Sequence, residues 1–329
     1  MIRLRTWLRD QGAGRLAYRW WHRPRQKIAL ARTYGWSVVW HAARGECAMR
    51  RAARRLPPLP ALPESLPGIR ICFLTGRNFV HQTAFCAHSF ATQARTDTRF
   101  EFLSDGSLTS EDAATLLHLF PRAQVHNIAG QDQRVCQTLP PSKFPVLHAV
   151  RRDYVFLRKL TDAMAGTTGY RLYFDSDMLF WRQPEELLAR AATRNPLYMA
   201  DIVDDGYTMT RDAITRSLGV AAATGVNAGL VGLDASRIDW ELMERACESL
   251  RNSPGDQRLL EQTLWAIALG AQDARPLAAD TYRLVIDPMQ WHAARIQTPS
   301  PALLHYAWHA RLPYTASEWR RYLGDKNAA

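Results

Sequence analysis

Short apolar runs alternate with segments of helical spacing from residue 69 onward, and this alternation is the clearest pattern along the chain. Eight runs have the length and the β-branched or aromatic content of strands: 69–75, 100–103, 124–128, 170–174, 197–202, 226–233, 282–286 and 302–306. Five other segments repeat apolar residues at helical intervals: 83–94, 110–119, 154–165, 185–194 and 256–269. The pattern predicts a domain that contains both strands and helices.

The order of these elements predicts how the sheet is built. Strand and helix alternate regularly at first and irregularly later, which favours an α/β fold: a Rossmann-like mixed sheet, parallel in its first half and flanked by helices. A basic N-terminal segment, predicted to be helical, is added to this sheet. Thr109 or Ser110 is expected to cap one helix, and Pro184 to stand in the first turn of another. Since ligands bind at the carboxyl ends of parallel strands, the residues that follow each apolar run are the candidates for chemistry.

A proline-rich stretch separates this body from the N-terminus. Residues 56–68 hold five prolines, and such density sustains neither a helix nor a central strand. We predict a stiff, extended linker over 56–68, between an N-terminal segment of residues 1–55 and one domain of residues 69–329.

The charge is concentrated in the N-terminal segment. Residues 1–55 carry fourteen basic and two acidic residues, whereas the rest of the chain carries 28 basic and 29 acidic residues. Five of the eleven tryptophans lie in the same segment: Trp7, Trp20, Trp21, Trp36 and Trp40. Arginine and tryptophan both favour a boundary between water and an apolar phase, so an anionic membrane surface is one expected partner. An accessory helical lobe is the alternative, and nucleic-acid binding is unlikely.

Composition and cysteine usage exclude several other classes. With 329 residues and 47% hydrophobic content, the chain can bury a large core, so it is neither disordered nor a disulfide-stapled miniprotein. Its five cysteines are widely spaced and form no C-x-x-C pair, which indicates a reducing compartment. There is no apolar run of about 18 residues and no secretory signal. We therefore expect a cytoplasmic protein that is peripheral to the inner face of the membrane.

Two carboxylates interrupt a buried strand. The run 170–174 ends at Asp175, Ser176 and Asp177 and then resumes as an apolar run. Two acids in such a place are costly unless a positive group neutralises them, and a hard divalent cation with oxygen ligands does so. A surface turn or an ion pair with arginine is the alternative.

Five segments, in order, resemble one family. Residues 173–179 are similar to the D-x-D segment of the GT-A-fold, nucleotide-sugar-dependent glycosyltransferases, in particular glycosyltransferase family 8. The other four segments resemble the family's K-L pair, N-A-G segment, D-Q helix start and late histidine: Lys159-Leu160, Asn227-Ala228-Gly229, Glu261-Gln262 and His305-Tyr306-Ala307. The resemblance covers residues 69–315 and implies a GT-A fold.

The resemblance also assigns roles to individual residues. It implies that Asp175, Asp177 and His305 hold a Mn²⁺ or Mg²⁺ ion, an O,O,N donor set that suits either metal. It implies a nucleotide-diphosphate sugar donor, held by Lys159, Asp175, Ser176, Gly229, Glu261 and Arg311. His309 is a competing metal ligand, and Asp256-Gln257 is a rival for the D-Q match.

Two departures from the family pattern concern the diphosphate. Arg311 stands where the family has lysine, which keeps the positive charge but changes its geometry. The family's P-W pair is replaced by Pro313-Tyr314.

The first strand supplies the expected nucleotide side. It ends at Thr75, Gly76 and Arg77, and Gln82 and Thr83 follow at a helix start. Glycine permits close backbone approach, and a helix N-terminus attracts an anion. An ordinary turn between strand and helix is the alternative interpretation.

The expected reaction is sugar transfer to a glycan or a lipid-linked acceptor. The resemblance implies retention at the anomeric carbon, with Gln262 and Asn227 beside the reacting carbon. If Asp201 or Asp256 contacts the acceptor hydroxyl, it can serve as a base, and the outcome inverts. A sugar nucleotidyltransferase is less favoured, because the loop after the first strand has only one glycine. A degenerate transferase that acts as a non-catalytic membrane-surface partner is the third hypothesis.

Overall fold

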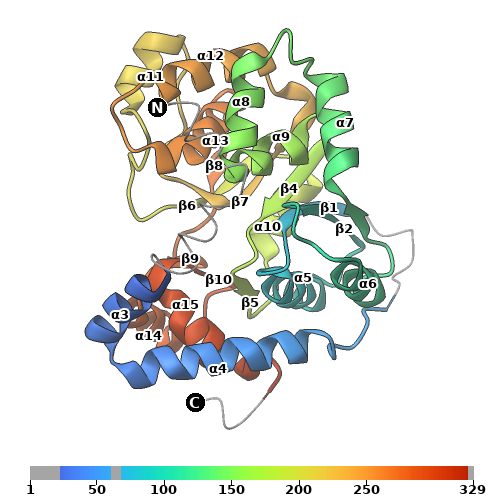
Figure 1. The fold of residues 1–329 in the computed structure, drawn as a ribbon, viewed down its shortest axis with the longest axis vertical. Helices are drawn as coiled ribbons and strands as arrows, with labels where there is room; N and C mark the ends of the chain where they lie inside the picture. The colour runs from blue at the N-terminus through green and yellow to red at the C-terminus, as the bar shows by residue number, and fades with distance from the viewer. Residues whose placement is uncertain (1–22, 61–67, 325–329) are drawn as a thin grey trace. The chain divides into compact units, whose positions relative to one another are not determined.

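The structure is a computed structural model that describes residues 23–60 and 68–324 (Figure 1). Trp7, Trp20 and Trp21, and most of the predicted linker, lie outside these residues. Contacts between Cα atoms divide the chain into two compact units, one formed by residues 1–49 with 312–329 and the other by residues 50–311. The predicted division into 1–55, 56–68 and 69–329 stays a prediction.

The helices, in chain order, are α3 (Arg23–Tyr34), α4 (Trp36–Ala53), α5 (Val80–Ala94), α6 (Ser110–Leu119), α7 (Ile128–Thr138), α8 (Pro145–Asp153), α9 (Arg158–Met164), α10 (Glu185–Ala192), α11 (Arg211–Leu218), α12 (Trp240–Arg251), α13 (Leu260–Gly270), α14 (Pro288–Ile296), α15 (Arg311–Pro313) and α16 (Trp319–Tyr322). The strands are β1 (Ile69–Thr75), β2 (Thr98–Ser104), β3 (Gln124–His126), β4 (Tyr170–Phe174), β5 (Met178–Phe180), β6 (Leu197–Ala200), β7 (Val226–Asp234), β8 (Arg275–Pro276), β9 (Tyr282–Val285) and β10 (Leu303–Tyr306).

A seven-stranded sheet in the order β3-β2-β1-β4-β7-β6-β8 forms the centre of the larger unit. The four strands β3, β2, β1 and β4 are parallel, whereas β7 is antiparallel to both β4 and β6. The predicted α/β fold, with a mixed sheet that is parallel in its first half, is confirmed.

Alternate residues of the central strands pack on opposite faces of the sheet. Cys72 and Tyr173 belong to a buried cluster that also contains residues of α7, α8, α9, α12 and α13. Phe73 and Phe174 lie on the other face, where Phe90 of α5 packs edge-on against Phe174 with ring centroids 5.4 Å apart. Figure 1 accordingly draws α5 and α6 on the side of the sheet opposite α7 and α9.

The acidic triplet joins this sheet to a second one. The smaller sheet has the order β5-β10-β9, and the chain passes from β4 into β5 through Asp175, Ser176 and Asp177. In the smaller sheet, β10 runs antiparallel to β5, and its residue His305 pairs with Met178. This register brings a histidine from far along the chain to the carboxyl end of β4.

Several elements differ from the prediction. The predicted helices 154–165 and 256–269 each begin as a 3₁₀ turn, over Val155–Leu157 and Gln257–Leu259, before α9 and α13. Pro184 is the residue before α10 rather than in its first turn, whereas Thr109 caps α6 with a capping box, as expected. The pattern missed helices that are buried on only one narrow face and strands of two or three residues: α7, α8, α11, α12, α14, β5 and β8.

The smaller unit contains the helical N-terminal segment. In it, α4 passes close to the π-helix Tyr314–Glu318, since a Cβ on Gly45 would stand 2.1 Å from the carbonyl oxygen of Thr315. The helical character predicted for this segment is therefore present in α3 and α4. Over residues 23–60 and 68–324, no helix has the length and apolarity needed to cross a bilayer.

Candidate metal and donor site

Asp175, Asp177 and His305 converge at the junction of the two sheets. One ligand atom from each lies within 4.8 Å of the others, and Nε2 of His305 is 3.2 Å from Oδ1 of Asp177. The backbone fixes this arrangement, because the amide of Tyr306 donates to the carbonyl oxygen of Asp177 at 2.8 Å. The three predicted metal ligands are thus brought together.

Each carboxylate of the cluster also contacts a cation. Nζ of Lys159, on α9, lies 2.7 Å from Oδ1 and 2.9 Å from Oδ2 of Asp175. Nε and Nη2 of Arg311 donate to Oδ2 of Asp177 at 2.8 and 2.6 Å. Burial opposes ionisation of Asp177, but Arg311 and His305 outweigh burial and hold its pKa well below the usual range.

Asn227 and Gly229, on β7, orient His305. Oδ1 of Asn227 accepts from the amide of Gly229 at 3.0 Å and lies 3.1 Å from Nδ1 of His305. Since an amide oxygen only accepts, Nδ1 carries the proton and Nε2 is left facing the carboxylates. A Cβ on Gly229 would stand 2.4 Å from Cε1 of His305, so the close approach requires glycine.

Gln262 and Asp201 form a second group beside Asn227. Oδ2 of Asp201 accepts from Nε2 of Gln262 at 3.4 Å and from Nδ2 of Asn227 at 3.5 Å. Nε2 of Gln262 also donates to the carbonyl oxygen of Gly206 at 2.9 Å. Asn227 contacts both groups, so the three predicted catalytic residues, Gln262, Asn227 and Asp201, adjoin the predicted metal ligands.

Glu261 is a buried acid close to this machinery. Burial raises its pKa to about 7, and the neighbouring charge of Asp175 adds to the rise while that of Lys159 opposes it. A carboxyl group that titrates near neutral pH beside a cluster of charges is typical of functional sites.

Thr75, Thr83 and Ser176 form a buried chain of hydroxyl groups. The oxygens of Thr75 and Thr83 lie 2.6 Å apart, and those of Thr83 and Ser176 lie 2.8 Å apart. This chain ties β1 and the first turns of α5 to the middle of the acidic triplet. Through its hydrogen bond to Ser176, this chain of hydroxyl groups holds the acidic triplet in position.

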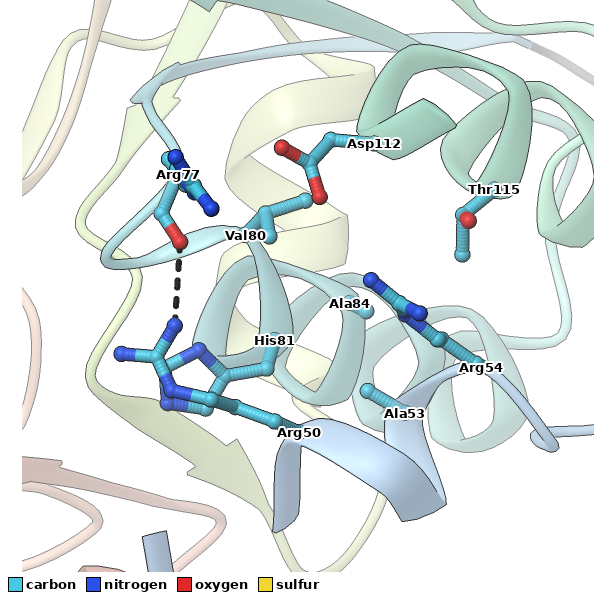
Figure 2. A pocket seen from close by; sticks show the side chains of 9 residues that line it. All are labelled: Arg50, Ala53, Arg54, Arg77, Val80, His81, Ala84, Asp112 and Thr115. Atoms are coloured by element: carbon cyan, nitrogen blue, oxygen red, sulfur yellow. Dashed lines mark hydrogen bonds between the residues drawn. The ribbon is translucent and has the colours of Figure 1, made fainter. Parts of the chain in front are cut away.

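Gly76, Arg77 and Gln82 lie elsewhere around the start of α5. A Cβ on Gly76 would stand 2.1 Å from Oδ1 of Asp105, so this glycine lets the loops after β1 and β2 meet. Arg77 lines a separate pocket, shown in Figure 2, and Gln82 is buried. Within the described ranges, no hydrogen bond or ion pair joins the side chains of Arg77 and Gln82 to the Asp–Asp–His cluster.

The rival assignments have other surroundings. Asp256 is ion-paired with Arg258 at 2.6 Å, and the side-chain amide of Gln257 donates to the carbonyl oxygens of Leu250 and Ser253. Among the described residues, the group that could hold a metal contains His305 and does not contain His309.

Tyr173, which was not predicted as a site residue, donates to Oδ1 of Asp175 at 3.1 Å. Its position two residues before Asp175 on a buried strand was the available signal.

The donor set fits a divalent cation. Two carboxylate oxygens and one imidazole nitrogen suit Mn²⁺ and also accept Mg²⁺. Asn227 fixes the histidine tautomer, as partners beyond the ligands do in metal sites. The residues present therefore match the cofactor that the sequence predicted, while the identity of the metal is a matter for experiment.

Comparisons with known proteins find similar folds among solved structures but no similar sequence among family models or curated proteins. No protein-family model and no curated protein matches the sequence. Among solved structures, the bifunctional glycosyltransferase WbbM in its apo form matches with a TM-score of 0.50 and 11% identity, over 83% of this chain and 53% of that one. The chain thus spans about half the length of WbbM.

Two further matches are also glycosyltransferases. The galactosyltransferase LgtC, in complex with donor and acceptor sugar analogues, is 17% identical over 77% of this chain and 99% of that one, with a TM-score of 0.47. GlyE from Streptococcus pneumoniae TIGR4 is 14% identical over 78% of this chain and 62% of that one, with a TM-score of 0.43. The match with WbbM, at a TM-score of 0.50, and the mixed seven-stranded sheet give the chain the GT-A type of fold that its sequence predicted.

Proposed function

We propose that this protein is a metal-dependent glycosyltransferase that takes a sugar from a nucleotide-diphosphate donor. One observation carries the proposal: Asp175, Asp177 and His305 meet within 4.8 Å, although the two acids lie between β4 and β5 and the histidine comes from β10. A cluster of this composition beside a lysine and an arginine is suited to a diphosphate leaving group, whose negative charge grows as the sugar departs.

In this proposal, a bound Mn²⁺ or Mg²⁺ supplies positive charge for the diphosphate. The chain itself contributes Lys159 and Arg311, which hold the two carboxylates and stand ready to contact the leaving group. Arg311 is half exposed, so its planar guanidinium is accessible to a phosphate in a bidentate arrangement. Glu261 and the backbone of Gly229 complete the donor side, together with Ser176.

The test is an assay of purified protein with Mn²⁺ and a panel of UDP, GDP and ADP sugars. We expect sugar transfer or slow donor hydrolysis that EDTA abolishes. Asp177→Asn should lower the rate at least a hundredfold, because it removes a ligand and the partner of Arg311. Asp212→Asn, on the exposed surface of α11, is the matched control and should leave the rate unchanged. Full activity of Asp177→Asn, or full activity of the unchanged protein in EDTA, would contradict the proposal.

We propose that transfer proceeds with retention at the anomeric carbon. Gln262 and Asn227 then position the reacting centre, and both donate to Asp201 rather than leaving it free to act as a base. Nuclear magnetic resonance of the product gives its anomeric configuration. An inverted product that Asp201→Asn no longer forms would instead identify Asp201 as a general base.

We also propose that residues 1–55 bind an anionic membrane surface, which suits a lipid-linked or glycan acceptor at the cytoplasmic face. Trp36 and Trp40 of α4 are 65% and 53% exposed, and the guanidinium of Arg44 lies 4.4 Å from the Trp40 ring. Such pairs are favourable where headgroups meet acyl chains.

Co-sedimentation with vesicles tests this surface. The double variant Trp36→Ser/Trp40→Ser should bind vesicles of phosphatidylglycerol and phosphatidylcholine several-fold more weakly than the unchanged protein, and donor hydrolysis in solution should stay the same. Equal binding by both proteins would refute the membrane role without touching the transferase proposal.

A further inference from the structure

A small pocket lies against the start of α5, among residues that the proposed reaction does not use, apart from the predicted Arg77. Its volume is about 200 Å³, and its polar lining consists of Arg50, Arg54, Arg77, His81, Asp112 and Thr115. These residues come from the end of α4 and the turn that follows it, where Arg54 lies, from the loop after β1, from the first turn of α5, and from α6. Figure 2 shows Arg54 and Arg77 on opposite sides of the pocket, with the carboxylate of Asp112 between them.

The pocket has an excess of positive charge. Three guanidinium groups line it against a single carboxylate, and that carboxylate already has a structural task. Oδ2 of Asp112 accepts from the backbone amide of Thr109 at 3.2 Å and from its hydroxyl at 2.7 Å, in the capping box of α6. Three like charges around one hollow repel one another, so an anion in the pocket would be stabilised by all of them.

The pairing of Arg54 does not remove this excess. Nη1 of Arg54 lies 2.8 Å from Glu111, but the two side chains are 55% and 69% exposed. An ion pair in water is weak and is screened by salt, so Arg54 can exchange Glu111 for a better anion at small cost.

Arg77 is the residue best placed for a ligand. Its backbone is fixed, because its amide donates to the hydroxyl of Ser107 at 3.0 Å and its carbonyl accepts from Nη1 of Arg50 at 3.1 Å. Its side chain is exposed, and among the described residues its guanidinium makes no hydrogen bond or ion pair. A fixed backbone that carries an uncommitted guanidinium at a pocket wall is pre-organised for an oxyanion.

His81 is consistent with a positive environment. Burial, with a further contribution from the charge of Arg50, lowers the pKa of His81 to about 3. The imidazole is therefore neutral at physiological pH, so the positive charge of the pocket wall comes from its guanidinium groups. The positive end of the α5 dipole points toward the same region.

We infer that this pocket binds a phosphate group, with Arg77 and Arg54 as its principal ligands. Planar guanidinium groups match the oxygens of a phosphate, and a volume of about 200 Å³ admits a phosphate with a short attached group but is small for a whole nucleotide sugar. The phosphate can belong to a soluble phosphorylated metabolite or to a lipid headgroup. This site does not depend on the proposed transferase activity.

The pocket is linked to the predicted nucleotide side of the fold. Nη1 and Nη2 of Arg50 donate to the carbonyl oxygens of Arg77 and Asn78, both at 3.1 Å. A ligand held by Arg77 would steady the loop that follows β1.

Isothermal titration calorimetry of the full chain with inorganic phosphate, in EDTA, tests the inference. EDTA removes divalent ions that could hold phosphate at the Asp–Asp–His cluster, whose two carboxylates are already paired with Lys159 and Arg311. We expect saturable binding that Arg54→Gln/Arg77→Gln weakens at least tenfold. The matched control Arg216→Gln/Arg237→Gln removes the same charge from exposed positions outside the pocket and should leave binding unchanged.

Two results with the unchanged protein and the two double variants would overturn the inference. One is the absence of saturable phosphate binding by the folded protein, with folding checked by circular dichroism for each variant. The other is an equal loss in both double variants, which would mean that only net charge matters. Asp177→Asn should keep its phosphate affinity, and a loss there would place the ligand at the acidic cluster and also refute the pocket.

Two soluble probes identify the source of the phosphate. Glycerol 3-phosphate represents a metabolite, and dibutyryl phosphatidic acid below its micelle concentration represents a lipid headgroup. Tighter binding of the second probe, lost in Arg54→Gln/Arg77→Gln, assigns a lipid, and the reverse order assigns a metabolite. If Arg54→Gln/Arg77→Gln leaves the binding of both probes unaltered, the pocket is rejected as their site.

Discussion

At the scale of single residues, the site depends on a glycine as much as on its charged side chains. Gly229 has no side chain, and His305 occupies the space that a Cβ would take. The carbonyl oxygen of Gly229 accepts a hydrogen bond from the amide of Asp175 at 2.6 Å, and the amide of Gly229 donates to Oδ1 of Asn227. One position on β7 therefore fixes two of the three predicted metal ligands.

We predict that Gly229→Ala displaces the imidazole of His305. The new Cβ would stand 2.4 Å from Cε1, so either the ring or the strand must shift. We expect Mn²⁺ affinity to fall at least tenfold and the free energy of unfolding to fall by about 1–3 kcal/mol, the usual cost of overpacking. Calorimetry with Mn²⁺ and urea unfolding measure the two effects. Ala228→Gly, at the neighbouring position, controls for backbone effects on β7, and wild-type metal affinity in Gly229→Ala would contradict the prediction.

Glu261 gives a residue-scale prediction with a defined pH dependence. Its folded pKa of about 7 lies above the ordinary value of 4.5, so the unfolded chain ionises first and stability is lost as the pH rises from 4.5 through 7. Glu261→Gln removes this penalty and should stabilise the protein by on the order of 3 kcal/mol at pH 8, with little effect near pH 4.5. Urea unfolding at both pH values measures the difference. A gain of equal size at both would mean that packing, and not ionisation, is responsible.

At the scale of elements, side chains that cross between strands hold the parallel half of the sheet together. Arg171 of β4 lies 2.7 Å from Sγ of Cys72 on β1 and 2.7 Å from Oε2 of Glu101 on β2. His126 of β3 lies 3.4 Å from the same carboxylate. Because β1 lies between β2 and β4, the Glu101–Arg171 pair links strands that are not direct neighbours.

We predict that Glu101→Gln destabilises this half of the sheet. Burial opposes ionisation of Glu101, but the hydrogen bond with His126 and the charge of Arg171 outweigh it and lower the pKa to about 2. A depressed acid pKa contributes stability above the unfolded value of 4.5, and this contribution is lost as the pH falls toward 2. The variant should lose about 2–3 kcal/mol at pH 7 and progressively less below pH 4.5. Urea unfolding across this range, with Glu248→Gln on α12 as control, measures the trend, and a loss that does not shrink in acid would contradict it.

At the scale of the whole molecule, the candidate metal site connects the two sheets of the larger unit. Asp175 and Asp177 lie between β4 and β5, and His305 comes from β10. An unfolded chain cannot assemble ligands that lie this far apart in sequence, so a cation held there binds the folded state almost exclusively.

We therefore predict that Mn²⁺ raises the melting temperature of the protein. A ligand at a hundred times its Kd stabilises the folded state by about 2.7 kcal/mol, which is a shift of several degrees for a chain of this size. Differential scanning fluorimetry with Mn²⁺ and then EDTA measures the shift. Asp177→Asn and His305→Ala should abolish it, and an unchanged shift in both variants would place the ion elsewhere.

Local features of the sequence determined much of the fold. The alternating apolar runs identified β1 and its parallel neighbours, because buried strands need apolar side chains regardless of what they pack against. Thr109 and Asp112 predicted the start of α6, since a capping box is completed within four residues. The triplet at 175–177 marked a site because two acids in a buried strand need a positive partner.

Only the tertiary structure decided what surrounds those acids. The pairing of β10 with β5 selects His305 over His309, and the proximity of Gln262 to Asp201 distinguishes it from Gln257. The same holds for Arg77, which the sequence predicted on the nucleotide side: the fold shows that it also lines a pocket with residues of α4 and α6, and its role toward the nucleotide stays a prediction. Such choices depend on strand register and on contacts between residues that lie far apart in the chain, 61 residues apart for Gln262 and Asp201, and no local pattern encodes them.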